Sequence, residues 1–409
     1  MTTTATIALL GALDTKGTEY GFVRDQLHAE GCDALLIDTG VLGEPQIAAD
    51  ISRRQVAATA GASLDRLQEQ HERGPGMKTM ADGAALILEG LVVSGDVDGT
   101  LALGGSNAAY IFAAACARLP LGLPKVLVST MATGDTRPYV GHTDMILVNP
   151  VVDINGLNRI SKPVLANAAK ACAGMVRSPF TGAEGAARAV AVSMFGVTTP
   201  CGAQLATQLE QAGLEPLTFH CTGTGGQTME ELIRSGTFAA VADMTTTELA
   251  DDLVGGVCSA GPERLTAAGK AGIPQVVSLG ALDMVNFGPA SSVPAQFANR
   301  LFHEHNPEVT LMRTTKEESA ELGRHIAEKL NTATAPVTVL IPAGGFSMLS
   351  TPGEPFHDPA ADAALIDSLT AGLRDTIDVR TFECDINDPA VAEAAADVVI
   401  NYMGEAIND

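Results

Sequence analysis

Short apolar segments alternate with helix-like segments along almost all of this 409-residue chain. The apolar segments are rich in β-branched residues and lack the polar alternation of a strand that has one solvent-exposed face. Strands of this kind are typical of parallel sheets that helices cover on both faces, so the pattern predicts an α/β protein. The expected strands are 6–10, 34–38, 99–105, 125–130 and 145–150, followed by 189–195, 216–220, 239–244, 275–279, 309–314, 337–343 and 397–402.

A small, polar segment, SPFTGAEGAAR at 178–188, interrupts this alternation near the middle of the chain. Its Pro and Gly residues are typical of a linker. We therefore expect two Rossmann-like domains, 1–178 and 189–409, each with a mostly parallel sheet and a ligand cleft at the strand carboxyl ends. The first turns of the two halves, GALDTKG at 11–17 and FGVTTPCG at 195–202, are alike. Either an ancient duplication or the shared demands of strand-to-helix turns explains the likeness.

Composition argues against several classes of protein. The net charge of −23 disfavours nucleic acids and anionic membranes as ligands, because those need clustered Lys and Arg. No apolar run approaches the about 20 residues of a membrane helix, and the N-terminus lacks the basic start of a signal peptide. The seven cysteines are widely spaced, which favours reduced thiols over a disulfide framework or a zinc site. We therefore expect a soluble, cytoplasmic protein.

Three loops in the first half follow predicted strands and share a composition of Gly, Ser and Thr. They are GALDTKG at 11–17, GGSNAAY at 104–110 and STMATGDTRPYVG at 129–141. Glycines let the backbone approach a ligand closely, and helix N-termini present free amides to anions. Neither a Walker A spacing nor a G-x-G-x-x-G fingerprint is present. The loops together still predict a phosphate-binding site at one edge of the sheet.

Side chains in these loops add to the phosphate prediction. Lys16 can contact a phosphate, and Asp14 or Asp135 could hold a magnesium ion. The alternative is that the glycines only make turns and that Asp14 and Ser106 cap helices. The candidate cofactor-binding residues are Gly11, Asp14, Thr15, Lys16, Gly104, Gly105, Ser106, Asn107, Ser129, Thr130, Gly134 and Asp135.

Loops of the second half carry candidates for catalysis and for substrate binding. His220 and Asp243 at strand ends, and Glu230 in the first turns of a predicted helix, are candidate acid–base groups. Alternatively, His220 is a hydrogen-bonded histidine at a sheet edge and Glu230 stabilises the helix dipole. The candidate substrate-binding residues are Thr222, Gly223, Gly225, Gly226, Thr245, Thr246, Glu248, Gly344 and Gly345.

Several motifs together resemble the Tm-one-like ATP-binding domain family. The resemblance lies in 119–161, which includes VSTMATGDTRPYVGHTDMILVNP, and in 195–201, 219–232, 243–257 and 278–289. It covers nearly the whole chain. It implies an adenine nucleotide, ATP, bound with Mg²⁺, two Rossmann-like domains and a homodimer or higher homo-oligomer. It also implies that plant relatives carry a further, barrel-like C-terminal domain.

One loop departs from the pattern of this family. The family usually reads Gly-Gly-Ser-Gly-Gly-Thr where this chain reads GGSNAA, so that Gly104, Gly105 and Ser106 match and Asn107, Ala108 and Ala109 do not. Because added Cβ atoms restrict how closely a backbone approaches a phosphate, the affinity or the choice of nucleotide could differ.

Two classes of function follow from these motifs. We expect an ATP-binding protein that acts as a magnesium-dependent enzyme on a small metabolite. The alternative is a nucleotide-dependent interaction or regulatory protein, which the role of the plant relatives as inhibitors of viral replication suggests. A third possibility is a two-lobed metabolite-binding protein without turnover.

Overall fold

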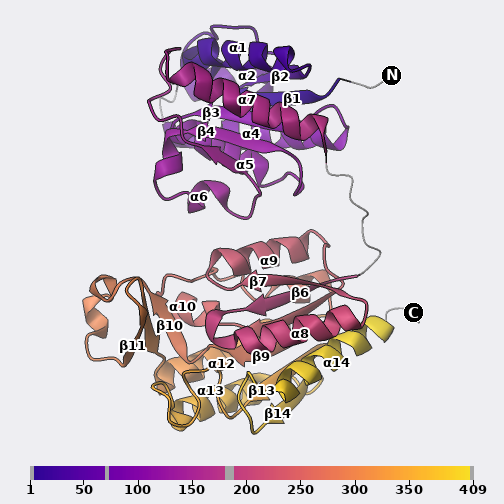
Figure 1. Ribbon diagram of the computed structural model, residues 1–409, viewed down its shortest axis with the longest axis vertical. Helices are drawn as coiled ribbons and strands as arrows, with labels where there is room; N and C mark the ends of the chain where they lie inside the picture. Colours follow the sequence, from indigo (N-terminus) through magenta and orange to yellow (C-terminus); the bar gives the residue numbers. More distant parts are fainter. Residues whose placement is uncertain (1–3, 70–72, 180–187, 406–409) are drawn as a thin grey trace. The chain divides into compact units, whose positions relative to one another are not determined.

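The computed structural model describes residues 4–69, 73–179 and 188–405. The chain divides into two compact units, unit 1 (Met1–Ala183) and unit 2 (Glu184–Asp409), which Figure 1 shows. Most of the expected junction at 178–188 lies outside the described residues. Among the helices of the described segments, we find none that is long and apolar enough to cross a membrane.

Unit 1 alternates strands and helices, as its sequence predicts. Its strands are β1 (Thr6–Gly11), β2 (Asp33–Asp38), β3 (Gly99–Gly104), β4 (Lys125–Ser129) and β5 (Ile146–Val148). Its helices are α1 (Leu13–Ala29), α2 (Arg53–Thr59), α3 (Leu64–Glu69), α4 (Arg73–Val93), α5 (Ser106–Cys116), α6 (Arg137–Val140) and α7 (Ser161–Arg177).

The strands of unit 1 form a parallel sheet in the order β2-β1-β3-β4-β5. This is the flavodoxin-like order, in which the chain adds β2 on one side of β1 and then crosses to the other side. Helices α1 and α7 cover one face, and α2, α4 and α5 cover the other (Figure 1). Residues from both faces of β1 are buried, which explains why its sequence is apolar throughout.

Unit 2 repeats this plan with additional elements. Its strands are β6 (Ala189–Met194), β7 (Glu215–His220), β8 (Ala240–Thr245), β9 (Gln275–Gly280), β10 (Met284–Phe287), β11 (Phe302–Asn306), β12 (Val309–Arg313), β13 (Val337–Pro342) and β14 (Asp378–Phe382). Its helices are α8 (Thr199–Gln211), α9 (Thr224–Arg234), α10 (Glu248–Val254), α11 (Ala267–Ala271), α12 (Lys316–Asn331), α13 (Pro359–Gly372) and α14 (Pro389–Glu405).

The main sheet of unit 2 is parallel, in the order β14-β13-β9-β8-β6-β7. Helices α8 and α14 pack on one face, and α9, α11, α12 and α13 pack on the other. A separate antiparallel sheet contains β10, β12 and β11. The two parallel sheets, each covered by helices, confirm the predicted fold class of two Rossmann-like domains.

Two of the expected strands are wrong in type or partner. Residues 397–402 belong to helix α14, where Val391, Ala395, Val398 and Met403 are buried. Their spacing of three to five residues is that of one helix face, which the β-branched composition of the segment concealed. The segment expected as a parallel strand at 309–314 is β12, which pairs antiparallel with β10 and β11.

A tyrosine hydroxyl joins β1 and β3 where their direct pairing ends. The register of the two strands ends at Leu10 opposite Ala102. Beyond it, the hydroxyl of Tyr20 donates to the Leu10 carbonyl at 2.6 Å and accepts from the Leu103 amide at 2.9 Å. Burial raises the pKa of this phenol, so the hydroxyl keeps its proton. Gly11 makes room for the ring, because a Cβ there would lie 2.0 Å from the Tyr20 oxygen.

Replacing Tyr20 by Phe should therefore destabilise unit 1. The substitution leaves the Leu103 amide and the Leu10 carbonyl without this partner, and we expect the free energy of unfolding to fall by about 1–3 kcal/mol. Urea denaturation of the full chain, followed by circular dichroism, measures the change. Tyr110→Phe is the matched control, because the side chain of Tyr110 is exposed. Equal stability of the two variants would contradict the bridging role of Tyr20.

Candidate functional site

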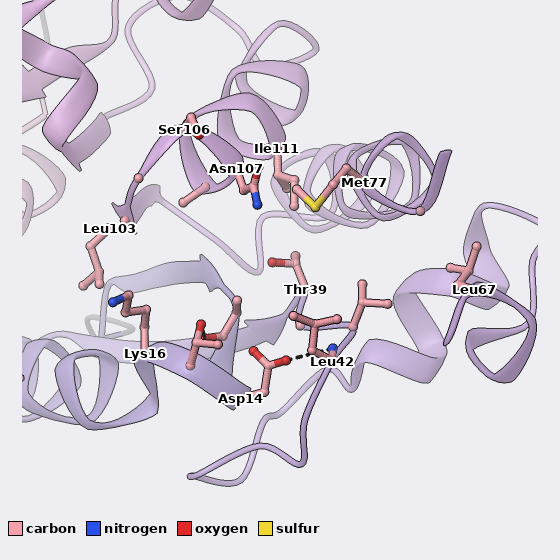
Figure 2. Close-up of a pocket in the computed structure, with 18 of the residues that line it drawn as sticks. Asp14, Lys16, Thr39, Leu42, Leu67, Met77, Leu103, Ser106, Asn107 and Ile111 are labelled. Atoms are coloured by element: carbon pink, nitrogen blue, oxygen red, sulfur yellow. Dashed lines mark hydrogen bonds between the residues drawn. The ribbon is translucent and has the colours of Figure 1, made fainter. Parts of the chain in front are cut away.

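A pocket of about 600 Å³ lies at the carboxyl edge of the unit 1 sheet. It is lined by the segments that follow β1, β2 and β3, including Asp14 to Lys16, Thr39 to Leu42 and Gly104 to Ala108 (Figure 2). The strand order reverses between β1 and β3. In open parallel sheets, ligands bind at the carboxyl ends of the strands on either side of such a reversal. The strand order and the position of the cavity therefore indicate the same ligand-binding site.

The start of helix α5 forms one wall of this pocket. Its N-cap is Gly105, and no side chain caps the helix. Ser106 and Asn107, in the first turn, are exposed and line the pocket. Gly104 has a φ of +149°, a backbone conformation that side chains other than glycine rarely adopt. The first amides of α5 and the positive end of its dipole are thus available to an anion.

The start of helix α1, in contrast, is already occupied by a carboxylate of the protein. Asp38, at the end of β2, accepts hydrogen bonds from the amides of Leu13 at 3.1 Å and Gly40 at 2.8 Å. Burial raises the pKa of Asp38, and these amide hydrogen bonds oppose the shift. The loop at 11–17 therefore contributes side chains to the pocket, while its first helical amide is bound to Asp38.

Asp14 and Lys16 both line the pocket and have defined partners. One carboxylate oxygen of Asp14, Oδ2, accepts from the amides of Leu42 and Gly43, each at 3.0 Å (Figure 2). The other, Oδ1, is buried and has no hydrogen-bond partner among the described residues. The ammonium of Lys16 donates to the carbonyl of Ile154. Asp14, at the wall of the pocket, thus keeps one buried carboxylate oxygen with unused hydrogen-bonding capacity.

Apolar side chains also line the pocket. They belong to Val41, Leu42, Leu67, Met77 and Ile111, and Figure 2 shows Leu67 and Met77 on the side away from Lys16 and Ser106. Apolar walls with a few polar groups are typical of small-molecule sites. Two further polar residues line the pocket.

Thr39 and Gln68 are these polar residues. Thr39 is buried, and its side chain points into the pocket (Figure 2). The amide nitrogen of Gln68 donates to the Val41 carbonyl at 2.7 Å and so fixes the loop that follows β2. Sequence reasoning missed Thr39, Gln68 and Met77. Thr39 follows β2, and its position after the second strand of a βαβ unit was the signal that could have indicated it. Gln68 and Met77 lie in helices α3 and α4, away from any strand end, so no local pattern indicated them.

Several predicted cofactor residues do not line this pocket. Gly11 accommodates Tyr20, as described above. Ser129 is buried, and its hydroxyl accepts from the Met131 amide at 3.2 Å. Asp135 pairs with Arg137 at 2.7 Å on the surface. Thr130 and Gly134 are likewise absent from the lining, although Thr130 lies beside α5, with its hydroxyl 3.9 Å from the position of a Cβ on Gly105.

In unit 2, the predicted acid–base carboxylates surround a buried arginine. Arg264 is fully buried, and its guanidinium contacts Glu230 at 3.3 Å, Asp243 at 2.7 Å and Glu248 at 2.6 Å. Glu230 also accepts hydrogen bonds from the amides at the start of α11, from Leu265 to Ala267. Both carboxylate oxygens of Glu230 are therefore used in contacts within unit 2. The geometry favours a structural role for Glu230 and Asp243.

The amides of the glycine-rich segment at the start of α9 also have hydrogen-bond acceptors within unit 2. Glu248 accepts from the amides of Gly223 at 2.7 Å and Gly226 at 3.0 Å. Gly225 lies against the chain, because a Cβ there would be 1.8 Å from the His220 carbonyl oxygen. His220 itself is exposed and stacks on Phe195 with ring centroids 5.4 Å apart. The amides expected to bind a substrate therefore bind Glu248.

The remaining predicted substrate residues have partners within unit 2. Thr245 shares a hydroxyl–hydroxyl hydrogen bond of 2.7 Å with Thr198, and Thr246 donates to the Ser278 carbonyl. The hydroxyl of Thr222 donates to the His220 carbonyl at 3.5 Å. The amides of Gly344 and Gly345 donate to the carbonyls of Cys384 and Pro342. These contacts hold the carboxyl edge of the second sheet together.

Comparisons with known proteins establish the family. The N-terminal domain of the uncharacterised protein family UPF0261 matches residues 5–181, and its C-terminal domain matches residues 187–403. This chain belongs to the UPF0261 family. A UPF0261 protein of Clostridium tetani is 45% identical over 97% of this chain and 98% of its own length. The family supports the resemblance found in the sequence, whereas ATP, magnesium and a homodimer remain predictions.

A tomato protein is also similar. The ToMV resistance protein Tm-1(GCR237) of Solanum lycopersicum is 44% identical over 73% of this chain, which corresponds to 41% of the tomato protein. Among solved structures, a UDP-N-acetylglucosamine 2-epimerase from Rickettsia bellii matches 61% of this chain and 77% of its own. Because its TM-score is 0.24 and its identity is 9%, this similarity supports no conclusion about the present chain.

Replacing Arg264 by Leu should destabilise unit 2 strongly. The substitution leaves buried carboxylates without their cation, and we expect a loss of about 3–5 kcal/mol in the free energy of unfolding. Arg234→Leu is the matched control, because Arg234 pairs with Glu231 at the surface, where an ion pair contributes about 0–1 kcal/mol. Urea denaturation of both variants measures the difference. Similar stabilities would show that the cluster is not the structural centre of unit 2.

Proposed function

We propose that this protein binds ATP with Mg²⁺ in the unit 1 pocket and uses it in a reaction on a small metabolite. The observation that carries the proposal is the division of one pocket into two ends. One end presents the uncapped start of α5, and the other presents apolar side chains. A nucleotide has the same division into a polyphosphate and a planar base.

The phosphates are assigned to the start of α5. Its free amides and dipole favour an anion, and the hydroxyl of Ser106 adds a donor. Lys16 lines the same pocket and supplies a positive charge. The start of α1 is a poorer candidate, because the Asp38 carboxylate already binds the Leu13 amide.

The base is assigned to the apolar end. Leu67 and Met77 offer flexible apolar surface to a ring, and Thr39 lies between them and Lys16 (Figure 2). The volume of about 600 Å³ lies within the range of small-molecule sites.

Magnesium is assigned to Asp14 alone of the two predicted aspartates. The unpartnered Oδ1 of Asp14 suits a hard cation, which takes one or two carboxylates and fills its other positions with phosphate oxygens and water. Asp135 is paired with Arg137 and does not line the pocket. When bound, the ion would neutralise charge on the phosphates.

A second candidate function comes from the tomato relative. Its name describes resistance to a virus, which favours an interaction protein in which the nucleotide stabilises a form that binds a partner. Phosphate release from ATP by the purified full chain, measured with and without a panel of metabolites, separates the two candidates. Metabolite-dependent release supports the enzyme. Binding of ATP without release, with the panel exhausted, supports the interaction protein.

Replacing Asn107 by Asp should weaken ATP binding without destabilising the protein. An acidic side chain in the first turn stabilises helix α5 through its dipole, yet it repels a phosphate at the same place. We expect the Kd for Mg–ATP, measured by calorimetry, to rise at least about tenfold, which is about 1.4 kcal/mol. Asn306→Asp, at the exposed end of β11 in unit 2, adds the same charge and should leave the Kd unchanged. Equal effects of the two variants would reject the phosphate assignment.

Replacing Asp14 by Asn should reduce the contribution of Mg²⁺ to ATP binding. The Asn carbonyl still accepts from the Leu42 and Gly43 amides, while an NH₂ group replaces the free carboxylate oxygen. Calorimetry with and without Mg²⁺ measures how much the ion lowers the Kd for ATP. We expect that factor to fall in the variant, and an unchanged factor would place the ion elsewhere.

A further inference from the structure

The loop that follows β5, residues 149–156, is tied to helix α1 at two points. The ammonium of Lys16 donates to the carbonyl of Ile154. The carboxylate of Glu19, which is buried, accepts from the amide of Gly156 at 2.7 Å. The side chain of Ile154 is buried in the core between α1 and α7. Helix α1 therefore holds this loop through one charged donor and one charged acceptor.

The same loop contains an unfavourable backbone conformation. Val151 has a φ of +67°, which a β-branched residue rarely adopts, and 70% of its surface is exposed. Its amide donates to the side chain of Asn149 at 3.0 Å. Conformations of this kind persist only where surrounding contacts impose them. Lys16 and Glu19 of α1 contact this loop, and the hydroxyl of Ser161 in α7 donates to the Gly156 carbonyl. Of these contacts, the one from Lys16 lies nearest to Val151 along the chain, so we expect its loss to let this part of the loop relax.

Lys16 lines the pocket and also holds the loop through its contact with the Ile154 carbonyl, which we call the tether. It lines the pocket together with Ser106 and Asn107, the residues to which the phosphates are assigned. An ammonium binds a phosphate oxygen more strongly than it binds a neutral carbonyl, because both partners are then charged. A phosphate in the pocket therefore competes directly with the Ile154 carbonyl for Lys16.

We propose that phosphate in the unit 1 pocket draws Lys16 from the Ile154 carbonyl and releases residues 149–155 of the loop, so that this segment reports whether the pocket is occupied. The inference rests on the proposed nucleotide site. A ligand shifts an equilibrium only by as much as it prefers one state. The phosphate prefers the released state, because only in that state is the ammonium of Lys16 free to contact it. Glu19 keeps its contact with Gly156, so the change is confined to the part of the loop before that residue.

Hydrogen exchange of the full chain tests this coupling. The amides of Val152 and Asn155 are bonded within the loop, to the carbonyls of Pro150 and Asp153. We expect Mg–ATP to accelerate exchange in peptides that cover 149–155 by at least about threefold. Adenosine, which has no phosphate, should bind more weakly and leave this exchange unchanged. Calorimetry under the same conditions shows which ligand is bound.

Two lysine variants separate the tether from the ligand site. In Lys16→Met the tether is absent, so exchange in 149–155 should be fast without ligand and should not respond to Mg–ATP. Lys162→Met, at an exposed position in α7, is the matched control and should behave as the wild type. If exchange in 149–155 were as slow in unliganded Lys16→Met as in the control, Lys16 would not hold the loop, and the proposal would be rejected. Binding of Mg–ATP to the wild type with no change in the loop would overturn the coupling and leave the proposed function intact. Failure of Mg–ATP to bind at all would reject the proposed function, and the coupling with it.

Discussion

The unit 1 site depends on how β1 and β3 part at the carboxyl edge of their sheet. Two neighbouring parallel strands normally continue their hydrogen bonds to the end. Here the hydroxyl of Tyr20 takes the place of a direct bond, because it contacts both the Leu10 carbonyl and the Leu103 amide. The ring reaches this point only because Gly11 has no side chain. The segments after the two strands then diverge, and the pocket lies between them. Tyr20 of α1, which does not line the pocket, thereby helps to shape the site.

The two units share a strand plan but differ in how they treat the starts of their helices. In unit 1, Asp38 binds the start of α1, and the start of α5 is left open. In unit 2, Glu248 binds the glycine-rich start of α9 and is itself neutralised by Arg264. A carboxylate at such a place satisfies the same amides that would bind a phosphate. Internal carboxylates therefore decide where an external anion has free amides.

The sequence predicts the architecture better than the chemistry, for physical reasons. Continuously apolar strands and their helices follow from local patterns, although α14 was in part mistaken for a strand because Val398, Val399 and Ile400 are β-branched or apolar. The glycine-rich loops look equivalent in composition, and only long-range contacts distinguish them. The pairing of Glu248 with Gly226, or of Asp38 with Leu13, joins residues over 20 positions apart. Arg264 lies in a segment without any motif. Its one indication was that buried carboxylates need a cation as a partner.

These contacts also limit where chemistry can occur. A general acid or base needs a lone pair or proton that is free to exchange with the substrate. Glu230 and Asp243 use their oxygens on Arg264, and Glu230 also binds the start of α11, so protonation of either would leave the arginine buried with less compensation. In the described part of unit 1, Asp14 has an oxygen without a partner and lines the pocket, which Thr15 and Ser106 also line. The proposed reaction therefore has its best-placed polar groups in the pocket of unit 1, and the contacts of the buried acids of unit 2 favour a structural role for them.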